Sequence, residues 1–231
     1  MNEARDHIAR KKYWDKRLPE LTASIEMMDK TIRSGKIAQE RLIPSKRFAE
    51  HKRLQQMICM YSCGEPLESC RSVFINNVHN IVECWGPQES YVELLWYVSL
   101  GILFNLPPDE KQLLKQLIPK ELQGDMLLSF LATEGQMGNT DTKLFAMRDP
   151  YSKLESLLRK EESNPIEVLK NYLSIWYPCH KGMEWFDSHK HGDQFFGYWS
   201  FEAAAIVKVL KLDDISLNNT SYYPYDMAHF E

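Results

Sequence analysis

The sequence predicts an all-α protein, and three observations point to this fold class. The chain has 231 residues and a hydrophobic content of 44%, which lets it bury a core as one large domain or two small ones. Its 10 glycines and 11 prolines are few for a β-sandwich or barrel, whose short strands need frequent turns. Apolar residues recur at helical spacing, and no run alternates as a strand does. We therefore expect a compact bundle of roughly nine to ten helices.

Helices fill most of the N-terminal half. The first, over residues 4–36, is long and basic, with Pro19 marking a kink or restart and Gly35 a natural C-cap. The second is expected over 45–62, with an apolar face made of Phe48, His51, Leu54, Ile58 and Tyr61. A third follows Pro66, and a fifth covers 109–118. The fourth, over 88–105, is apolar nearly all round, which places it at the centre of the fold.

The C-terminal half continues the helical pattern after a short break near residues 119–124. Helices are expected over 125–133, 151–162, 165–177 and 200–211, with a polar, glycine-rich loop at 134–150. Asn164 followed by Pro165 is typical of an N-cap and a first-turn proline. We expect two helical domains, residues 1–121 and 122–231.

The net charge of −4 conceals an asymmetry along the chain. Residues 1–60 hold 14 Lys and Arg against 8 Asp and Glu, whereas residues 61–231 hold 14 against 24. One explanation is that a long, solvated first helix happens to be basic. The other is that an acidic body steers the chain towards a basic partner, since a field of one sign raises association rates.

The cysteines indicate a reducing compartment. Cys59, Cys63, Cys70, Cys84 and Cys179 are an odd number without a CxxC pair, and no secretory apolar segment stands near the start. We expect a cytoplasmic protein in which all five are small core residues. The most apolar stretch, 94–104, is far shorter than the roughly 20 residues of a membrane span, so no membrane partner is expected.

A histidine-rich stretch raises the question of a metal site. Asp187, His189, His191 and Asp193 alternate in sequence, and such residues can gather a divalent ion if the segment is extended. On a helix, however, residues two apart point in different directions. No motif completes a ligand set, so no metal is expected, although a metal-dependent hydrolase remains an alternative.

Other catalytic chemistries have no motif in the sequence. The chain has no Gly-x-Ser-x-Gly elbow and no phosphate-binding loop, and Cys179 and His180 are adjacent only in a turn. The basic stretch 7–17 has two aromatic residues, but the acidic bulk opposes a phosphate backbone. We expect no catalytic residue, no cofactor and no nucleic-acid partner.

Aromatic and acidic residues concentrate at the C-terminal end. Residues 176–231 hold 13 of the 27 Phe, Trp and Tyr, interleaved with carboxylates. Aromatic anchors in an acidic field suit recognition of a basic protein surface. Trp185, Phe186, Trp199 and Phe201 are nevertheless expected mostly in the core.

The same region carries a family resemblance. Residues 185–230, through "GYWSFEAAAIVK" at 197–208, "LDD" at 212–214 and "YYPYD" at 222–226, closely resemble the C-terminal signature of the PoNi immunity proteins, the inhibitors of PoNe-type bacterial DNase toxins. The long basic helix, helical hairpin and central apolar helix are similar to that family's preceding domain.

The resemblance implies an all-helical, non-enzymatic cytoplasmic protein that blocks the active site or DNA-binding surface of a cognate DNase delivered by contact-dependent or type VI secretion. A helical adaptor that binds a regulatory protein through the same acidic face is a further alternative. The candidate partner-binding residues are Glu184, Asp187, Asp193, Tyr198, Asp213, Asp214, Tyr223 and Asp226.

Overall fold

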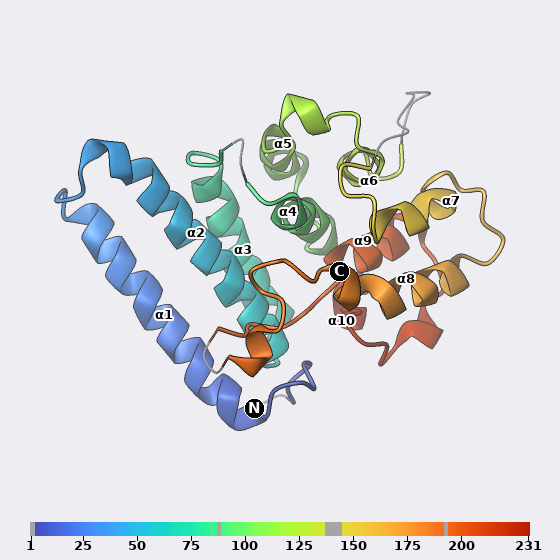
Figure 1. Cartoon of the computed structure of the whole chain (residues 1–231), viewed down its shortest axis with the longest axis horizontal. Coiled ribbons are helices and arrows are strands. Elements are labelled where there is room, and N and C mark those ends of the chain that lie inside the picture. The colour runs from blue at the N-terminus through green and yellow to red at the C-terminus, as the bar shows by residue number, and fades with distance from the viewer. Residues whose placement is uncertain (1–2, 87–88, 137–144, 192–193) are drawn as a thin grey trace. The chain divides into compact units, whose positions relative to one another are not determined.

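The protein is all-α in the computed structural model (Figure 1), which describes residues 3–86, 89–136, 145–191 and 194–231. No strand occurs in these ranges, so the predicted fold class is confirmed. The α-helices are α1 (Lys11–Arg33), α2 (Gln39–Ser62), α3 (Leu67–Ile81), α4 (Tyr91–Leu103), α5 (Pro108–Gln116), α6 (Met126–Ala132), α7 (Glu155–Leu158), α8 (Pro165–Cys179), α9 (Phe201–Leu210) and α10 (Tyr225–Ala228). Short 3₁₀ turns include Ser188–Lys190 and Ile215–Leu217.

Local sequence signals explain several helix ends. The Asn164 side chain accepts a hydrogen bond from the Glu167 amide, and Pro165 occupies the first turn of α8, as predicted. Gly35 follows α1 with a φ of 69°, a conformation that glycine adopts without steric cost. Neither Pro19 nor Pro44 ends its helix: α1 continues through Pro19, and α2 begins at Gln39, six residues earlier than expected.

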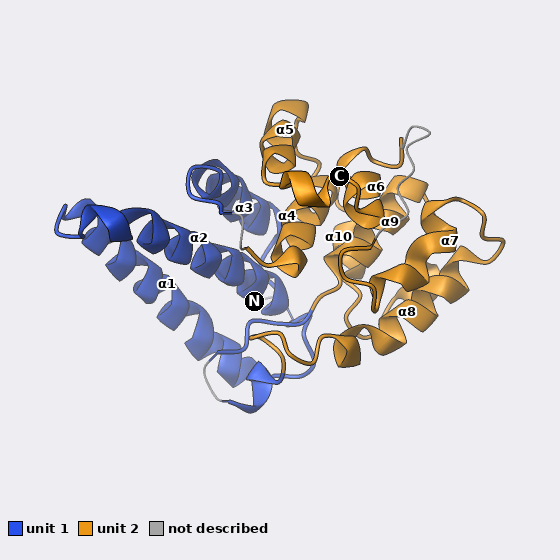
Figure 2. Cartoon of the chain, turned by 45° about the horizontal axis from the view of Figure 1, so that its top comes forward, with its two compact units in different colours: residues 1–86, 187–198 blue, residues 87–186, 199–231 orange. Residues whose placement is uncertain are grey.

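The chain forms two compact units (Figure 2). Unit 1 comprises residues 1–86 and 187–198, and unit 2 comprises 87–186 and 199–231. Unit 1 contains 16 Lys and Arg against 13 Asp and Glu, and unit 2 contains 12 against 19, so the units carry net charges of +3 and −7. The predicted domain boundary at residue 121 remains a prediction.

Unit 1 incorporates a segment from late in the sequence. The backbone oxygen of Phe195 accepts a hydrogen bond from the Tyr13 hydroxyl at 2.7 Å, and that of Phe196 accepts one from Ser62 Oγ at 2.8 Å. The Phe195 ring also lies 5.4 Å from the Trp14 ring, and both side chains are buried. Phe195 and Phe196 therefore join the core that α1 and α2 build.

Helix α4 is the centre of unit 2, as its all-round apolar sequence predicts. All its residues from Leu94 to Leu103 are buried, and it packs against α9, where Ala203, Ala204 and Ala205 have no exposed surface. A Cβ at Gly101 would lie 2.4 Å from Leu114 Cδ1, so glycine allows α5 to approach α4 closely. Within the described residues, no helix is both long enough and apolar enough to cross a bilayer.

A fully buried carboxylate links α8 to α9. Oε1 of Glu202 accepts hydrogen bonds from Tyr172 Oη at 2.6 Å, Trp176 Nε1 at 2.7 Å and Ser200 Oγ at 2.7 Å. Oε2 has no partner among the described residues. Hydrogen bonds to a charged acceptor are strong, and each donor would lose its partner if the carboxylate were removed.

His180 forms a second buried polar contact in unit 2. Its Nδ1 lies 2.6 Å from the Trp176 carbonyl oxygen, which can only accept, so Nδ1 carries the proton. Nε2 then accepts from the Tyr151 hydroxyl at 2.9 Å. Burial lowers the pKa of His180 and raises that of Tyr151 well above its usual value, so the imidazole stays neutral and the phenol stays a donor.

We predict that Glu202→Ala lowers the free energy of unfolding by about 3 kcal/mol or more, because three buried donors lose their acceptor. Urea unfolding measures the change. Glu202→Gln, which keeps one acceptor oxygen, is expected to cost less, and the exposed control Glu184→Ala is expected to cost less than about 0.5 kcal/mol. Equal stability of the Ala variant and the wild type would contradict the role of this carboxylate.

We predict that acid destabilises unit 2 through His180. Its folded-state pKa lies below the ordinary value of 6.5, so the unfolded chain binds the proton first as the pH falls. The stability due to the neutral imidazole is therefore present above about pH 6.5 and is lost as the pH falls through the folded pKa. The free energy of unfolding, measured in urea above and below pH 6.5, should depend less on pH in His180→Gln than in the wild type. The same pH dependence in both proteins would refute this role of His180.

Candidate functional site

The candidate site is the acidic turn, residues 212–217, which follows α9 in unit 2. Helix α9 ends where Lys211 adopts a left-handed conformation with a φ of 53° and the Leu212 amide donates to the Val207 carbonyl oxygen. Asp213 Oδ1 then accepts from the Ile215 amide at 3.3 Å, and Leu217 turns inward and is buried. These local hydrogen bonds fix the path of the turn.

Asp214 holds the turn to the C-terminal tail. Only 1% of Asp214 is exposed, and its Oδ2 accepts from the Tyr223 hydroxyl at 2.5 Å, while Oδ1 contacts His229 Nε2 at 2.8 Å. Burial and the hydrogen bond to Asp214 raise the pKa of Tyr223, which keeps its phenol a donor. The second Asp of the "LDD" motif, Asp214, and the second Tyr of "YYPYD", Tyr223, are thus hydrogen-bond partners.

The first Tyr of "YYPYD" also has a structural role. The Tyr222 ring stacks on the Tyr177 ring at 5.3 Å, and the Tyr222 carbonyl oxygen accepts from the Ser200 amide at 2.8 Å. These contacts join the tail to α8 and to the start of α9.

The acidic turn presents an apolar side chain beside a carboxylate. Ile215 is 72% exposed, the largest value among the exposed large hydrophobic side chains of the described residues, and Asp213 next to it is also exposed. An exposed isoleucine on a rigid, acidic turn suits a protein interface. Sequence reasoning recognised the "LDD" motif but missed Ile215, because helical or strand periodicity gives no signal in a turn.

The predicted partner-binding residues fall into different environments. In unit 2, Glu184 and Asp213 are exposed and Asp226 is half-buried. In unit 1, Asp187 is half-buried and forms an ion pair with Lys190 at 2.9 Å. Asp193 lies outside the described residues.

Three of the predicted residues are buried and have partners inside the protein. Tyr198 Oη lies 3.1 Å from Ser188 Oγ and 3.0 Å from His189 Nδ1, and Tyr223 is bonded to Asp214 as described above. These three side chains are buried beneath the surface, so a partner protein would not contact them directly. Sequence reasoning could not separate adjacent carboxylates such as Asp213 and Asp214, because only tertiary contacts decide which of them is buried.

The histidines of the predicted metal stretch do not assemble a ligand set among the described residues. His189 uses Nδ1 to contact Tyr198, and His191 is exposed. No group of three metal-ligand side chains found in the described part of the chain includes either histidine.

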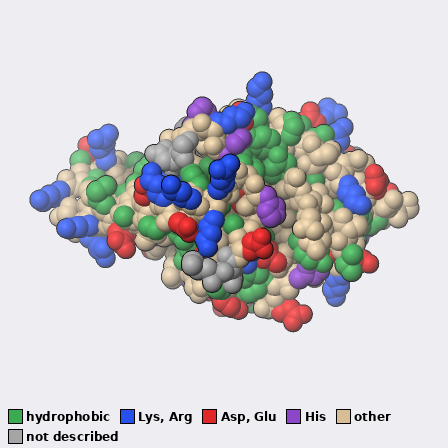
Figure 3. Space-filling view, turned by 90° about the horizontal axis from the view of Figure 1, so that it is seen from below, with side chains coloured by type: hydrophobic (Ala, Val, Ile, Leu, Met, Phe, Trp, Pro, Cys, Tyr) green, Lys and Arg blue, Asp and Glu red, His purple; other side chains and the backbone are tan. Residues whose placement is uncertain are grey.

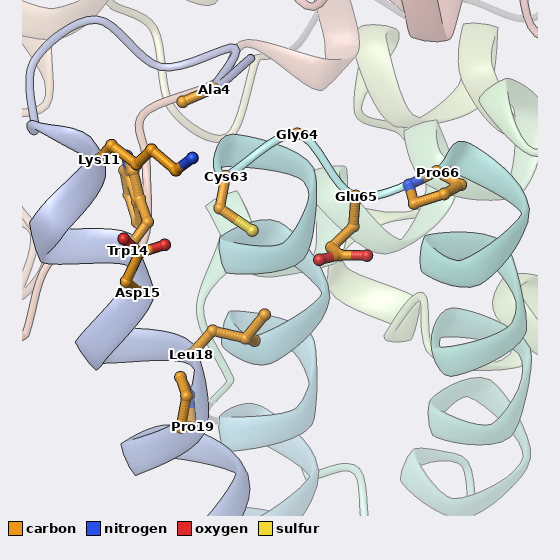
Figure 4. Close-up of a pocket in the computed structure, with 10 residues that line it drawn as sticks. All are labelled: Ala4, Lys11, Trp14, Asp15, Leu18, Pro19, Cys63, Gly64, Glu65 and Pro66. Atoms are coloured by element: carbon orange, nitrogen blue, oxygen red, sulfur yellow. The ribbon is translucent and has the colours of Figure 1, made fainter. Parts of the chain in front are cut away.

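A pocket in unit 1 holds mixed charges (Figure 4). It measures about 440 Å³ and is lined by Lys11 and Asp15 from α1 and by Cys63 and Glu65 from the α2–α3 connection. Burial raises the pKa of the Cys63 thiol, and Cys63 Sγ lies 3.3 Å from the Met60 carbonyl oxygen. This cysteine stays a thiol, so the pocket offers no activated sulfur nucleophile.

All five cysteines are free, as predicted, but not all of them lie in the core. Cys59, Cys70 and Cys84 are buried, whereas Cys63 and Cys179 are half-buried. Burial raises the pKa of Cys59 to about 12 and that of Cys84 to about 11, which suppresses thiolate chemistry.

We predict that Tyr223→Phe loosens the acidic turn. The substitution leaves Asp214 Oδ2 buried without its donor and should lower the free energy of unfolding by about 1–3 kcal/mol. Tyr225→Phe is the matched control, because the Tyr225 hydroxyl forms no hydrogen bond within the described part of the chain, and it should change stability by less than about 0.5 kcal/mol. Thermal unfolding compares the two, and equal effects would show that the Tyr223–Asp214 bond is dispensable.

The chain resembles a solved structure in fold and matches the models of a known family in sequence. The crystal structure of protein PA2201 from Pseudomonas aeruginosa matches 99% of this chain and 90% of its own, with a TM-score of 0.73 and 15% identity, which shows a shared fold. No curated protein matches the sequence. The family model of PoNe immunity protein (PoNi), N-terminal, matches residues 5–118, and that of PoNe immunity proteins (PoNi), C-terminal, matches residues 123–227. The chain therefore belongs to the PoNe immunity proteins, and it is an immunity protein and not an enzyme.

Proposed function

We propose that the protein neutralises a DNase toxin by covering the toxin's positively charged DNA-binding surface with the acidic turn. Membership of the PoNe immunity family gives the partner, a cognate PoNe toxin. The observation that carries the proposal is the exposed pair Asp213 and Ile215 on a turn that Asp214 anchors internally.

The charge of unit 2 supports this mode of binding. Its net charge of −7, from 12 Lys and Arg against 19 Asp and Glu, opposes that of a surface that binds a phosphate backbone. Carboxylates of an inhibitor compete with phosphates for the same cations, and the long-range field accelerates encounter.

The rigidity of the turn supports it as well. A contact residue that is already fixed in the free protein loses little conformational entropy on binding. Apolar side chains surrounded by polar groups dominate the energy of many interfaces, so Ile215 would supply affinity and Asp213 would supply steering.

The place of action follows from the target. We propose that the protein acts in the cytoplasm, where DNA is the toxin's substrate, against a toxin delivered by contact-dependent or type VI secretion. The free cysteines agree with a reducing compartment.

We predict that Asp213→Lys combined with Ile215→Arg weakens binding to the cognate toxin about 100-fold, since like charges then face each other and the apolar anchor is lost. Stopped-flow mixing with a catalytically inactive toxin should show slower association, most clearly at low salt. A titration of DNA cleavage by the active toxin should require correspondingly more of the variant.

Glu161→Lys is the control. Glu161 is exposed in unit 2, and its reversal changes the net charge by two units, against three for the double variant, so it should alter association only slightly. Wild-type affinity of the double variant would place the interface elsewhere. Failure of the wild type to protect DNA from the active toxin would refute the mechanism.

A further inference from the structure

The seam between α1 and α2 opens into a groove near the connection of the two helices in unit 1. The groove has a volume of about 760 Å³, and its apolar wall is made of Met27, Met28, Ile32, Ile37 and Phe48. Ala38 and Ser45, whose side chains are small, also line it.

The groove exposes large apolar side chains. Met27 is 65% exposed and Phe48 is 54% exposed, and Ile43 in the same part of α2 is 42% exposed. These are three of the five exposed large hydrophobic side chains of the described residues. The sequence predicted Phe48 on the apolar face of its helix, and this part of that face is exposed. Clustered apolar exposure of this kind marks interaction surfaces.

The spacing of the lining residues fits a third helix. Arg41, Ser45 and Phe48 follow one another at i, i+4 and i+7 along α2, and Met28 and Ile32 are four apart on α1. Two such rows form the floor on which an amphipathic helix packs its own apolar stripe. Methionine at Met27 and Met28 adapts its shape to the partner's side chains.

The charges of the groove select an acidic partner. Lys36 and Arg41 line it, and no carboxylate does. Neither cation has an ion pair among the described residues, and the nearby Asp29 is engaged by Arg53 at 2.5 Å. In Figure 3, Lys and Arg side chains lie around hydrophobic side chains at the left end, where the α1–α2 connection lies, with Asp or Glu side chains among them.

We propose that this groove binds an acidic amphipathic helix of the toxin, with its apolar stripe on Met27 and Phe48 and its carboxylates on Lys36 and Arg41. The inference rests on the proposed function for the identity of the partner. A flat anionic membrane could not contact the recessed part of the groove lining. A helix fits into a concave groove and could contact it. An acidic helix seated here would add contacts that depend on the toxin's own side chains, which permits discrimination between cognate and foreign toxins.

Binding of the inactive toxin to two groove variants tests the proposal. Met27→Ser with Phe48→Ser removes the apolar anchors, and Lys36→Glu with Arg41→Glu reverses the charge. Both alter exposed side chains, so circular dichroism and thermal unfolding should match the wild type. Arg10→Glu with Lys12→Glu is the control, because both residues are exposed in unit 1 and the change of charge is the same.

Each groove variant should weaken toxin binding about 10-fold or more, whereas the control should bind as the wild type does. Tight toxin binding by both groove variants would overturn the proposal and leave the acidic turn as the interface. Failure of the wild type to bind toxin would instead refute the proposed function, on which the groove's partner rests. Binding of the wild type, but not of the groove variants, to vesicles of phosphatidylglycerol and phosphatidylethanolamine would overturn the proposal in favour of a membrane.

Discussion

A buried carboxylate must be met by donors, and this requirement organises the C-terminal third of the protein. Glu202 accepts three hydrogen bonds that bring together α8 and the start of α9. Asp214 accepts from Tyr223 and contacts His229, which ties the acidic turn to the tail. A buried carboxylate without these donors would lower the free energy of unfolding. Each buried acid therefore needs a donor beside it, and tyrosine hydroxyls supply one to both.

The same constraint separates structural from exposed positions within the family signature. In "GYWSFEAAAIVK", Ser200 and Glu202 belong to the buried network, and the three alanines let α9 approach α4. In "LDD", Asp214 is buried, whereas Asp213 is exposed beside Ile215. Buried signature residues hold the fold, so we expect exposed neighbours such as Ile215 to set the choice of partner.

The sequence predicted the fold class and most helices because apolar spacing, caps and prolines are local signals. It placed the apolar helix α4 in the core correctly. It could not predict that Phe195 and Phe196 join the core built by α1 and α2, since this pairing depends on contacts far apart in sequence. The expected loop at 134–150 is only partly within the described residues, because 137–144 lie outside them.

The candidate site was less predictable than the fold. The motifs at 197–208, 212–214 and 222–226 resembled the correct family, and the family membership supports neither the metal-dependent hydrolase nor the adaptor. The side chains that face solvent were not predictable, since burial of Tyr198 and Asp214 depends on tertiary partners. Whether the exposed candidates contact the toxin remains a prediction.

Amide hydrogen exchange of the protein with and without inactive toxin tests the central claim most directly. The account predicts that amides of the acidic turn, residues 212–217, exchange more slowly in the complex, because the toxin covers them. Unchanged exchange in this turn, with protection confined to other parts of unit 2, would contradict the claim that Asp213 and Ile215 form the interface.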